Sequence, residues 1–409
     1  MTDQTSTIST DAKALADRPK GWKMTTLGEV VEVKGGKRLP LGTALQQQKN
    51  SHPYLRITDI VDNVIQKDKL LYVPDSVFPS IKRYIVSDGD IILSIVGTIG
   101  SVSRIDSELH NASLTENCVK LTNFRLIDNI YLFHYLISRE GQAEILGKNV
   151  GSTQPKLPIY NIEKINILLP PLPEQTAISA VLGSLDNKIE LLREQNKTLE
   201  SIAQAIFKEW FMNFNFPGST GIMIDSEMGK IPIGWRVGTL GDVICLEYGK
   251  PLKEEVRSGK GYPVLGSNGI VGYHKDYLIK GGGIVVGRKG TMGSVVWIDE
   301  NFYPIDTTFY VQDRLGVGKL YFHYLLLLIQ NFQKIGSDSA VPGLNRNAAY
   351  SIETVVPTTE IVNRFHEVIE PIFSKLKLNR AQIQTLSKLR STLLPRLMKG
   401  EVRVKGFSN

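Results

Sequence analysis

The sequence predicts an α+β protein built as a tandem repeat, in which a strand-rich domain followed by one long helix occurs twice. Matched motifs recur in the same order in both halves of the chain, which indicates an internal duplication. Each half also ends in a long stretch with the heptad spacing of a coiled coil. Before each stretch, short β-branched runs are bounded by glycine turns, as in curled, mostly antiparallel sheets.

The internal repeat is carried by five ordered matches. Their spacing drifts from 213 residues (21 to 234) to 187 residues (155 to 342), so the loops differ in length while the order is kept. The matched segments are 21–30 with 234–243, 97–102 with 290–295, 133–136 with 322–325, Pro155 and Leu157 with Pro342 and Leu344, and 169–170 with 356–357. Such ordered similarity predicts two copies of one structural unit.

The central long helix is expected over residues 171–213, after a rigid proline lead-in. Its apolar seam follows an alternating 4,3 spacing and is interrupted by one polar residue, Asn196. At about 1.5 Å per residue this seam is roughly 48 Å long. The seam residues are Ile178, Leu182, Leu185, Ile189, Leu192, Asn196, Leu199, Ala203, Ile206 and Trp210. A single helix cannot bury such a stripe, so a partner helix is needed.

The partner is expected near the C-terminus, over residues 358–404, where the same spacing recurs with Asn379 in the seam. We expect the two helices to pair antiparallel, with facing residues whose numbers sum to 575. Asn196 then faces Asn379, and an amide pair in an apolar seam fixes the register. The same sum matches Leu199 with Leu376, Ile189 with Leu386, and Trp210 with Phe365. The alternative is that each helix packs separately on its own domain.

The remaining segments follow in order along the chain. Residues 1–20 are expected to form a flexible arm, and 214–233 a linker. The two domains are expected over 21–170 and 234–357. Strands are predicted over 30–33, 90–96 and 283–287, helices near 131–146 and 320–335, and a kink at Pro395.

Composition limits the class of protein. The chain has 409 residues, 42% hydrophobic and 22% charged, with a net charge of +7 and a pI near 9.1. A basic balance fits an anionic partner such as nucleic acid. Cys118 and Cys245 lack metal-like spacing and are expected to be reduced core thiols. No apolar run is long enough to span a membrane and the N-terminus lacks a signal-peptide core, so a cytoplasmic protein without membrane contact is expected.

Motifs of catalysis are missing from the sequence. It contains no Asn-Pro-Pro-Tyr-like adenine-methyltransferase motif and no Phe-x-Gly-x-Gly cofactor loop. Residues 35–38 lack the spacing and the Ser/Thr of a phosphate-binding loop, and no cluster suggests a metal site. A non-catalytic protein is therefore predicted, and the alternative to DNA binding is a coiled-coil scaffold that binds only protein.

The arrangement resembles the DNA-specificity subunit of Type I restriction-modification systems. The resemblance is carried by the Leu-Pro-Pro-Leu-Pro-Glu-Gln run at 169–175, by 205–211, by the two Gly-Trp-x-x-x-Thr-Leu-Gly segments, and by the C-terminal run 386–397. It covers about residues 21–404, and the doubled order of domain and helix is its most specific feature.

The resemblance implies two target-recognition domains separated by two long antiparallel coiled-coil helices. Each domain would read one half of a bipartite, asymmetric site in double-stranded DNA, and the helices would set the gap between the halves. The helices would also dock two adenine-N6 methyltransferase subunits, and restriction subunits can join the complex. This chain would bind no cofactor, because S-adenosylmethionine belongs to the methyltransferase subunits.

Candidate DNA contacts in the first half are cations and hydroxyls on loops. For three of these sites a structural interpretation stays open. Arg56 could form a structural ion pair with Asp59 or Asp62. The glycine loop near Thr98 could be a plain turn, and the basic loop 34–40 could be a solvated turn. The candidates are Lys34, Lys37, Arg38, Arg56, Thr58, Lys82, Arg83 and Thr98.

Candidate DNA contacts in the second half centre on Arg288, which follows a strand that reads as buried. An arginine fork reads guanine bidentately, so Arg288→Ala is predicted to weaken discrimination at one base by about 1–3 kcal/mol. Unchanged specificity would argue against this placement. The other candidates are Lys250, Lys253, Ser267, Asn268, Tyr273, His274, Lys275, Lys289 and Thr291, with Arg257 as a further phosphate contact.

The spacer and partner interface is expected along the two helices. Phe207, Trp210 and Phe211 could anchor methyltransferase subunits, although Trp210 fits intramolecular packing equally well. His134 and His323 occupy equivalent positions and read as structural histidines. The remaining interface candidates are Leu185, Ile189, Leu192, Asn196, Leu199, Leu376, Asn379, Ile383 and Leu386.

Overall fold

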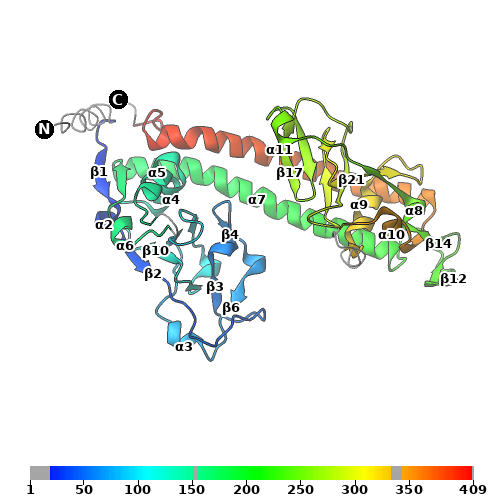
Figure 1. The fold of residues 1–409 in the computed structure, drawn as a ribbon, viewed down its shortest axis with the longest axis horizontal. Helices are drawn as coiled ribbons and strands as arrows, with labels where there is room; N and C mark the ends of the chain where they lie inside the picture. The colour runs from blue at the N-terminus through cyan, green and yellow to red at the C-terminus, as the bar shows by residue number, and fades with distance from the viewer. Residues whose placement is uncertain (1–18, 152–154, 333–342, 408–409) are drawn as a thin grey trace. The chain divides into compact units, whose positions relative to one another are not determined.

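The computed structural model describes residues 19–151, 155–332 and 343–407, so the predicted N-terminal arm lies almost wholly outside the described residues. The chain divides into two compact units. Unit 1 consists of Met1–Glu190 and Gln384–Asn409, and unit 2 consists of Leu191–Ile383. Figure 1 shows the elements along the chain.

Unit 1 is built on a four-stranded antiparallel sheet in the order β2-β10-β7-β8. A second sheet, β6-β3-β9, and the pairs β1-β11 and β4-β5 complete its strands. The strands are β1 Lys23–Thr26, β2 Glu32–Gly35, β3 Pro53–Leu55, β4 Ile60–Val61, β5 Val64–Ile65, β6 Leu71–Tyr72, β7 Ile91–Ser94, β8 Val102–Arg104, β9 Ser113–Leu114, β10 Cys118–Thr122 and β11 Asn166–Leu169. The short helices are α2 Leu27–Val30, α3 Phe78–Ile81, α4 Asn129–Ile137, α5 Arg139–Gly147 and α6 Ile159–Ile162.

Unit 2 repeats this plan. Its four-stranded sheet has the order β15-β21-β18-β19, its second sheet the order β17-β16-β20, and β14 pairs with β22. The strands are β12 Met223–Ser226, β13 Gly229–Pro232, β14 Arg236–Thr239, β15 Ile244–Tyr248, β16 Tyr262–Gly266, β17 Gly269–His274, β18 Gly283–Gly287, β19 Val295–Ile298, β20 Tyr303–Pro304, β21 Thr308–Asp313 and β22 Glu353–Val356. The short helices are α8 Leu240–Val243, α9 Tyr321–Leu328 and α10 Arg346–Tyr350.

The two units therefore share one α+β topology, and the predicted duplication is confirmed. Pairing is mostly antiparallel, as predicted; the exceptions, β3 with β9 and β16 with β20, are themselves equivalent. Gly36 and Gly249 also correspond. A Cβ atom on either would overlap the backbone carbonyl of Thr115 or of Ile305, so only glycine fits at both places.

Two helices of 40 residues each, α7 (Leu172–Phe211) and α11 (Thr359–Met398), run through both units. In unit 2 the Asn379 side chain donates a hydrogen bond of 2.9 Å to the Asn196 carbonyl oxygen, and the rings of Trp210 and Phe365 lie 5.6 Å apart. In unit 1 Arg390 donates to Asp186 at 2.7 Å. The first two pairs match the predicted sum of 575 and the third is one residue away, so the antiparallel pairing is confirmed in each unit.

Several predicted boundaries are wrong. The helix predicted near 131–146 is two helices, because the Ser138 side chain caps α5 and ends α4. Val30 belongs to α2 rather than to a strand, and the 214–233 linker contains the β12–β13 hairpin. The C-terminal helix ends at Met398 rather than near residue 404, and it continues through Pro395. Of the helix predicted near 320–335, α9 ends at Leu328 and residues 333–335 lie outside the described part.

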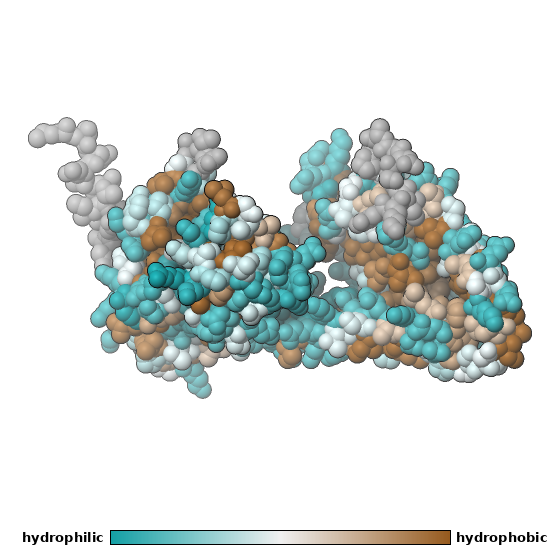
Figure 2. Space-filling view, turned by 90° about the horizontal axis from the view of Figure 1, so that it is seen from below, coloured by the Kyte–Doolittle hydropathy of each residue, from teal (hydrophilic) through white to brown (hydrophobic). Residues whose placement is uncertain are grey.

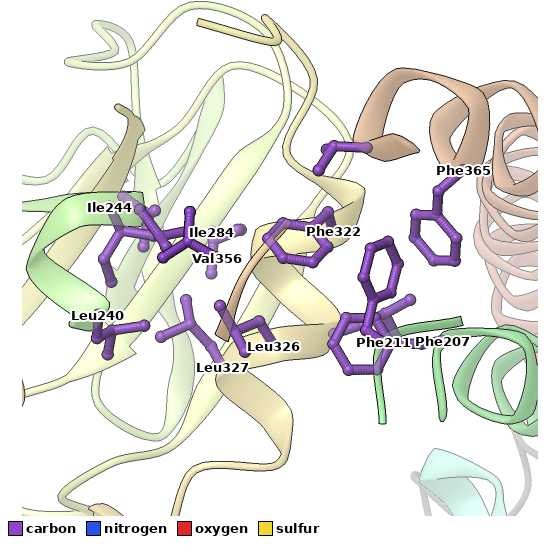
Figure 3. Packing of buried hydrophobic residues seen from close by; sticks show 14 of the residues in the cluster. Phe207, Phe211, Leu240, Ile244, Ile284, Phe322, Leu326, Leu327, Val356 and Phe365 are labelled. Atoms are coloured by element: carbon purple, nitrogen blue, oxygen red, sulfur yellow. The ribbon is translucent and has the colours of Figure 1, made fainter. Parts of the chain in front are cut away.

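Each unit has its own apolar core that includes one end of the long helices. In unit 1, Ile178, Leu182 and Leu397 pack with the sheet. In unit 2, the fully or nearly buried rings of Phe207, Phe211, Phe322 and Phe365 gather beside aliphatic residues of α9 (Figure 3). Phe322 comes from α9, so these contacts attach the globular part of unit 2 to its helices.

Unit 1 is attached to α7 by polar contacts at the proline-rich lead-in. The buried Glu174 carboxylate accepts hydrogen bonds from Trp22 Nε1 at 2.9 Å and from Arg403 at 2.7 and 2.8 Å. The Gln175 side chain accepts from the Asp128 amide and donates to the Pro170 and Leu126 carbonyls. The Glu-Gln dipeptide therefore fastens the first domain to the start of its helix.

Candidate nucleic-acid interface

The two glycine loops, 97–100 in unit 1 and 290–293 in unit 2, have the same backbone geometry. Gly97 and Gly290 have φ values of 78° and 80°, in the region that favours glycine. The amide of Ile99 donates to Gly97, and the amide of Met292 to Gly290, both at 2.9 Å. The second glycine of each loop turns back to the end of its strand, β7 or β18. Thr98 and Thr291 are thereby exposed at the tips of two equivalent turns.

The residue that follows each strand is held in the same way in both units. Ile95 and Arg288 both donate their amides at 2.9 Å, to Asn117 and Thr307, and both accept from a later leucine, Leu157 or Leu344. Arg288 and Ile95 therefore occupy equivalent structural positions in the two units. In unit 2 that position carries a guanidinium, and in unit 1 it carries an aliphatic side chain.

The second glycine loop gathers several of the predicted contacts. The Thr291 hydroxyl donates to the Asn268 side chain, and the Ser267 hydroxyl donates to the Thr307 carbonyl at 2.7 Å. Lys289, Asn268 and Thr291 are exposed, whereas Ser267 is buried and is used to hold the loop. The structure thus brings Lys289, Asn268 and Thr291 together with Arg288 at one surface of unit 2, and Ser267 lies beneath them.

Arg288 is positioned by an aromatic platform. Its guanidinium lies 4.9 Å from the ring centroid of Tyr248 and 5.9 Å from that of Phe309. One of its N–H groups donates to the Asp306 carbonyl at 3.1 Å. A second arginine, Arg346, lies over the same Tyr248 ring at 5.0 Å. Neither Tyr248 nor Arg346 is a sequence-based candidate.

The other candidates in unit 2 are more dispersed. Tyr273 and Lys275 are exposed, but His274 at the end of β17 is 8% exposed and faces Asp276 at 3.6 Å, so it is a structural residue here. Arg257 donates to the carbonyls of Val271 and Leu252. Lys250 and Lys253, which follow β15, are exposed.

Unit 1 has a basic pocket of about 350 Å³ in the corresponding region. Lys34 and Arg83 line it together with Lys120, which is not a sequence-based candidate, and with Tyr84. Lys120 donates to the Ile85 carbonyl at 2.7 Å and lies 3.5 Å from Asp90, whereas Lys34 pairs with Glu32 at 2.7 Å. The pocket is suited to an anion because its cations outnumber the carboxylates beside them.

Some cations of unit 1 are instead engaged with acidic residues. Arg56 donates two hydrogen bonds to the Asp59 carboxylate, at 2.6 and 3.0 Å, and Asp59 is 2% exposed. The structural role left open for Arg56 is thus the one observed. Arg38 pairs with Glu116 at 2.5 Å. Burial raises the pKa of Glu116, but the hydrogen bond from Arg38 lowers it, and the pKa ends below its ordinary value.

The remaining candidates of unit 1 lie on its surface. Lys37 lies 5.9 Å from the Tyr84 ring centroid, beside the basic pocket. Lys82 and Thr58 are exposed. Sequence reasoning missed Lys120 because it lies inside β10, where alternation of inward and outward residues is the only indication that it reaches the surface.

Several titratable groups are buried in the cores. Burial raises the pKa of the Cys118 thiol to about 12, so it is protonated and unreactive. His134 and His323 are fully buried at equivalent positions, near Asp186 and Asp313 respectively. Burial lowers the pKa of His134 to about 4. These placements agree with the structural role expected for both histidines.

The helix residues proposed as partner anchors are buried in unit 2. Phe207, Trp210 and Phe211 are 2%, 7% and 9% exposed and make tilted or edge-to-face ring contacts with one another and with Phe365, so intramolecular packing accounts for them. Ile189, Leu192, Leu376 and Asn379 are also buried, whereas Leu185, Leu199, Ile383 and Leu386 are half-buried.

Other apolar residues of the helices are exposed. Leu191 and Leu378 are 46% and 66% exposed, and Ile202 and Leu389 are 43% and 44% exposed. Each pair occupies equivalent positions, 187 residues apart. Figure 2 shows hydrophobic residues gathered in patches among hydrophilic ones over the drawn face of both units. In the described part of the chain, no helix is long and apolar enough to cross a membrane.

Comparison with known proteins identifies similar chains. A family model described as "Type I restriction modification DNA specificity domain" matches residues 19–201 and 232–388, once for each repeat. The chain is 26% identical to the MjaIX specificity subunit of Methanocaldococcus jannaschii, over 95% of each chain. It is 23% identical to the HindI specificity subunit of Haemophilus influenzae, covering 86% of this chain and 95% of that one.

The fold has a counterpart among solved structures. The S subunit of a type I restriction-modification system from M. genitalium superposes with a TM-score of 0.58 at 17% identity, covering 92% of this chain and 96% of that one. At this identity the match concerns the fold. It agrees with the duplicated α+β arrangement described above.

Proposed function

Because the chain belongs to the family of type I restriction-modification DNA specificity subunits, we propose that it reads a bipartite, asymmetric DNA site, one half with each unit. Specificity subunits are the non-catalytic, DNA-recognising members of these systems. The proposal assigns the reading of one half-site to the surface around each glycine loop.

The observation that carries the proposal is a shared framework with unlike side chains. Both units present the same loop from the same strand order, but position 288 is arginine where position 95 is isoleucine. Two such readers in one chain differ in the bases they contact, whereas a homodimer presents two identical ones. An asymmetric target is therefore the natural substrate.

The paired helices α7 and α11 are suited to fixing the gap between the half-sites. A duplex advances about 34 Å per turn, so half-sites one turn apart need a stiff spacer of that order. A 40-residue helix is about 60 Å long. The antiparallel pairing stiffens it, and the Asn196–Asn379 hydrogen bond holds its register.

The same helices are proposed to dock two adenine-N6 methyltransferase subunits, which would carry S-adenosylmethionine. The equivalent exposed pairs, Leu191 with Leu378 and Ile202 with Leu389, support this docking. Eleven residues are close to three helical turns, so Leu191 and Ile202 lie on one face of α7. Two equivalent apolar faces fit two copies of one partner. Restriction subunits would join the same complex.

The decisive experiment maps methylated adenines in DNA from cells that express this chain with a methyltransferase subunit. A motif of two short specific segments separated by a fixed unspecific gap is expected. An uninterrupted motif would overturn the two-reader proposal. Absence of sequence-specific methylation, together with no DNA retardation by the complex, would favour the alternative of a scaffold that binds only protein.

A further inference from the structure

We propose that Arg346 and Arg288, held together on the ring of Tyr248, form a guanine-reading pair in unit 2. The inference rests on the proposed function and deepens it, because it names the base and the residues that recognise it. Tyr248, at the end of β15, is 45% exposed.

Two arginines lie over the ring of Tyr248. The two guanidinium carbons lie 4.9 and 5.0 Å from its ring centroid, so they are no more than about 10 Å apart, within reach of cation–π attraction to a single ring. Two like charges within about 10 Å repel each other, and physiological salt, with a Debye length of about 8 Å, screens this repulsion only in part. An electronegative surface between or above them relieves that repulsion, and the guanine edge offers two acceptors.

The two arginine side chains have few polar partners within the protein. Within the described residues, ion pairs with carboxylates are formed by other arginines, such as Arg38, Arg236 and Arg390, and not by Arg288 or Arg346. Arg288 donates once, to the Asp306 carbonyl. The Nε of Arg346 is buried and unpaired, so the donors that Arg346 can offer to a ligand are its terminal N–H groups, which make no hydrogen bond within the described residues. By contrast, Arg38, Arg56 and Arg380 are each paired with acidic residues. The Tyr248 pair therefore keeps free N–H donors while its rotamers are restricted by stacking.

Unit 1 carries different residues at the three equivalent positions. Glu247 and Tyr248 pair with β21 as Lys34 and Gly35 pair with β10, so Gly35 corresponds to Tyr248. Ile95 corresponds to Arg288, and Ile159 lies two residues after Leu157 as Arg346 does after Leu344. Phosphates are alike in every sequence, so contacts to them are expected in both units. The cluster of Tyr248, Arg288 and Arg346 is present in unit 2 and absent from unit 1. Such a difference is expected of residues that read bases, because the two half-sites differ in sequence.

The chemistry then selects the base. The guanidinium fork matches the O6 and N7 acceptors of guanine in the major groove, which is the commonest specific contact of arginine. Stacking on Tyr248 fixes the plane of the fork before DNA arrives, so less side-chain freedom is lost on binding. A lysine at either position would keep the positive charge but lose the two-pronged donor geometry. An arginine-to-lysine variant therefore separates the contribution of charge from that of bidentate hydrogen bonding.

The test maps methylated adenines for the complex of the full chain with its methyltransferase subunit, in wild type and in Arg346→Ala, Arg346→Lys, Arg288→Ala and Tyr248→Leu. The wild-type motif is expected to contain guanine in the half-site changed by Arg288→Ala. Arg346→Ala and Arg346→Lys should each relax a guanine in that same half-site, by roughly 10- to 100-fold in discrimination. Tyr248→Leu should relax the guanine contacts of both Arg346 and Arg288.

Arg314→Ala is the matched control, because Arg314 also stacks on a tyrosine, Tyr350 at 5.3 Å, and donates to a carbonyl, that of Gly241. It should leave the motif unchanged. A half-site without guanine, an equal loss of binding to all sequences in Arg346→Ala, or changes in different half-sites for the two arginines would overturn the proposal. Because Arg346→Lys keeps the charge, it remains informative if the alanine variant folds poorly. If the wild-type motif were uninterrupted and the variants still lost discrimination for guanine, the bipartite site would be rejected. The guanine-reading role of the arginine pair would then stand.

Discussion

Arginine side chains in this chain serve two different purposes at the residue scale. Arg56 and Arg403 are held by the buried carboxylates of Asp59 and Glu174, where removal of one partner leaves an uncompensated charge. Arg288 and Arg346 lie on an exposed ring and retain donors for a ligand. Residue type alone does not separate these groups, because the distinction lies in what the guanidinium touches.

Buried histidine makes the stability of unit 1 depend on pH. His134 is fully buried, and burial lowers its pKa to about 4, below the usual 6.5. Asp186 and Asp128 raise this pKa, whereas Arg390 and Arg104 lower it further. The unfolded chain therefore binds more protons between pH 6.5 and 4, so the free energy of unfolding falls as pH falls through this window.

We expect His134 to account for a loss of about 2 kcal/mol in unfolding free energy between pH 7 and pH 5. His134→Gln, which has no charge to gain, should show a flatter dependence in urea unfolding at the two pH values. His110→Gln, at an exposed histidine of the same unit, is the control for the substitution itself. A wild-type protein equally stable at both pH values would contradict the prediction.

At the element scale, the long helices combine an apolar seam with specific polar contacts. Leu376 is 1% exposed beside Asn379, also 1% exposed, and the Asn379 amide bonds to Asn196. Arg380 binds both Glu200 and Asp299. The apolar residues give most of the stability, whereas the paired amides favour one register over slipped ones.

Asn379→Leu is expected to destabilise the protein by about 1–3 kcal/mol, because Asn196 loses its hydrogen-bond partner in the seam. The double variant Asn196→Leu with Asn379→Leu should recover much of that loss, since both amides are then removed. A double-mutant cycle by urea unfolding measures the coupling. Additive single effects would show that the hydrogen bond contributes nothing to stability.

The outer faces of the helices carry the second element-scale prediction. Leu389→Asp should remove one of two methyltransferase subunits from the complex, and the combination with Ile202→Asp should remove both, because a carboxylate cannot be buried in an apolar contact. Native mass spectrometry counts the subunits. Leu146→Asp is the control, since Leu146 is 55% exposed on α5 outside the helix pair. Unchanged stoichiometry in all three variants would place the docking surface elsewhere.

At the scale of the whole molecule, the duplication gives two units of one topology, and the helices α7 and α11 each contribute residues to both. The two units share strand order, loop geometry and the position of a buried histidine. They differ in the side chains that surround the loops, a basic pocket in unit 1 and an arginine pair in unit 2. The common framework gives the loops an equivalent place within each unit, and the proposed reading of two different half-sites rests on these differences.

A matched heptad insertion should lengthen the gap in the DNA site. Seven residues inserted between Gln195 and Asn196, with seven between Asn379 and Arg380, keep the seam in phase and lengthen both helices by about 10 Å. At 3.4 Å per base pair, the gap should grow by about three base pairs while both half-sites stay the same. Methylation mapping measures this change. Insertion of seven residues in the 214–233 linker is the control, and an unchanged gap in the helix variant would refute the spacer role.

The sequence by itself determined the features that depend on order and period. The repeated motifs predicted two units of one topology, and the 4,3 spacing with a single asparagine in each seam predicted the antiparallel register that Asn196 and Asn379 adopt. These succeed because heptads and capping motifs are local patterns whose meaning does not depend on the rest of the fold. The sequence predicted one helix where Ser138 separates α4 from α5. The segments on both sides of Ser138 have helical patterns, and a single serine between them does not by itself indicate a cap.

Only the tertiary structure decided which side chains meet. Tyr248 and Arg346 are 98 positions apart in the chain, and they touch because β15 and α10 are brought together by the sheet and by the bond between Leu344 and Arg288. The commitment of Arg56 to Asp59 and the burial of Phe207 follow in the same way from packing. Contacts of this kind depend on long-range strand pairing, which periodicity along the chain does not encode.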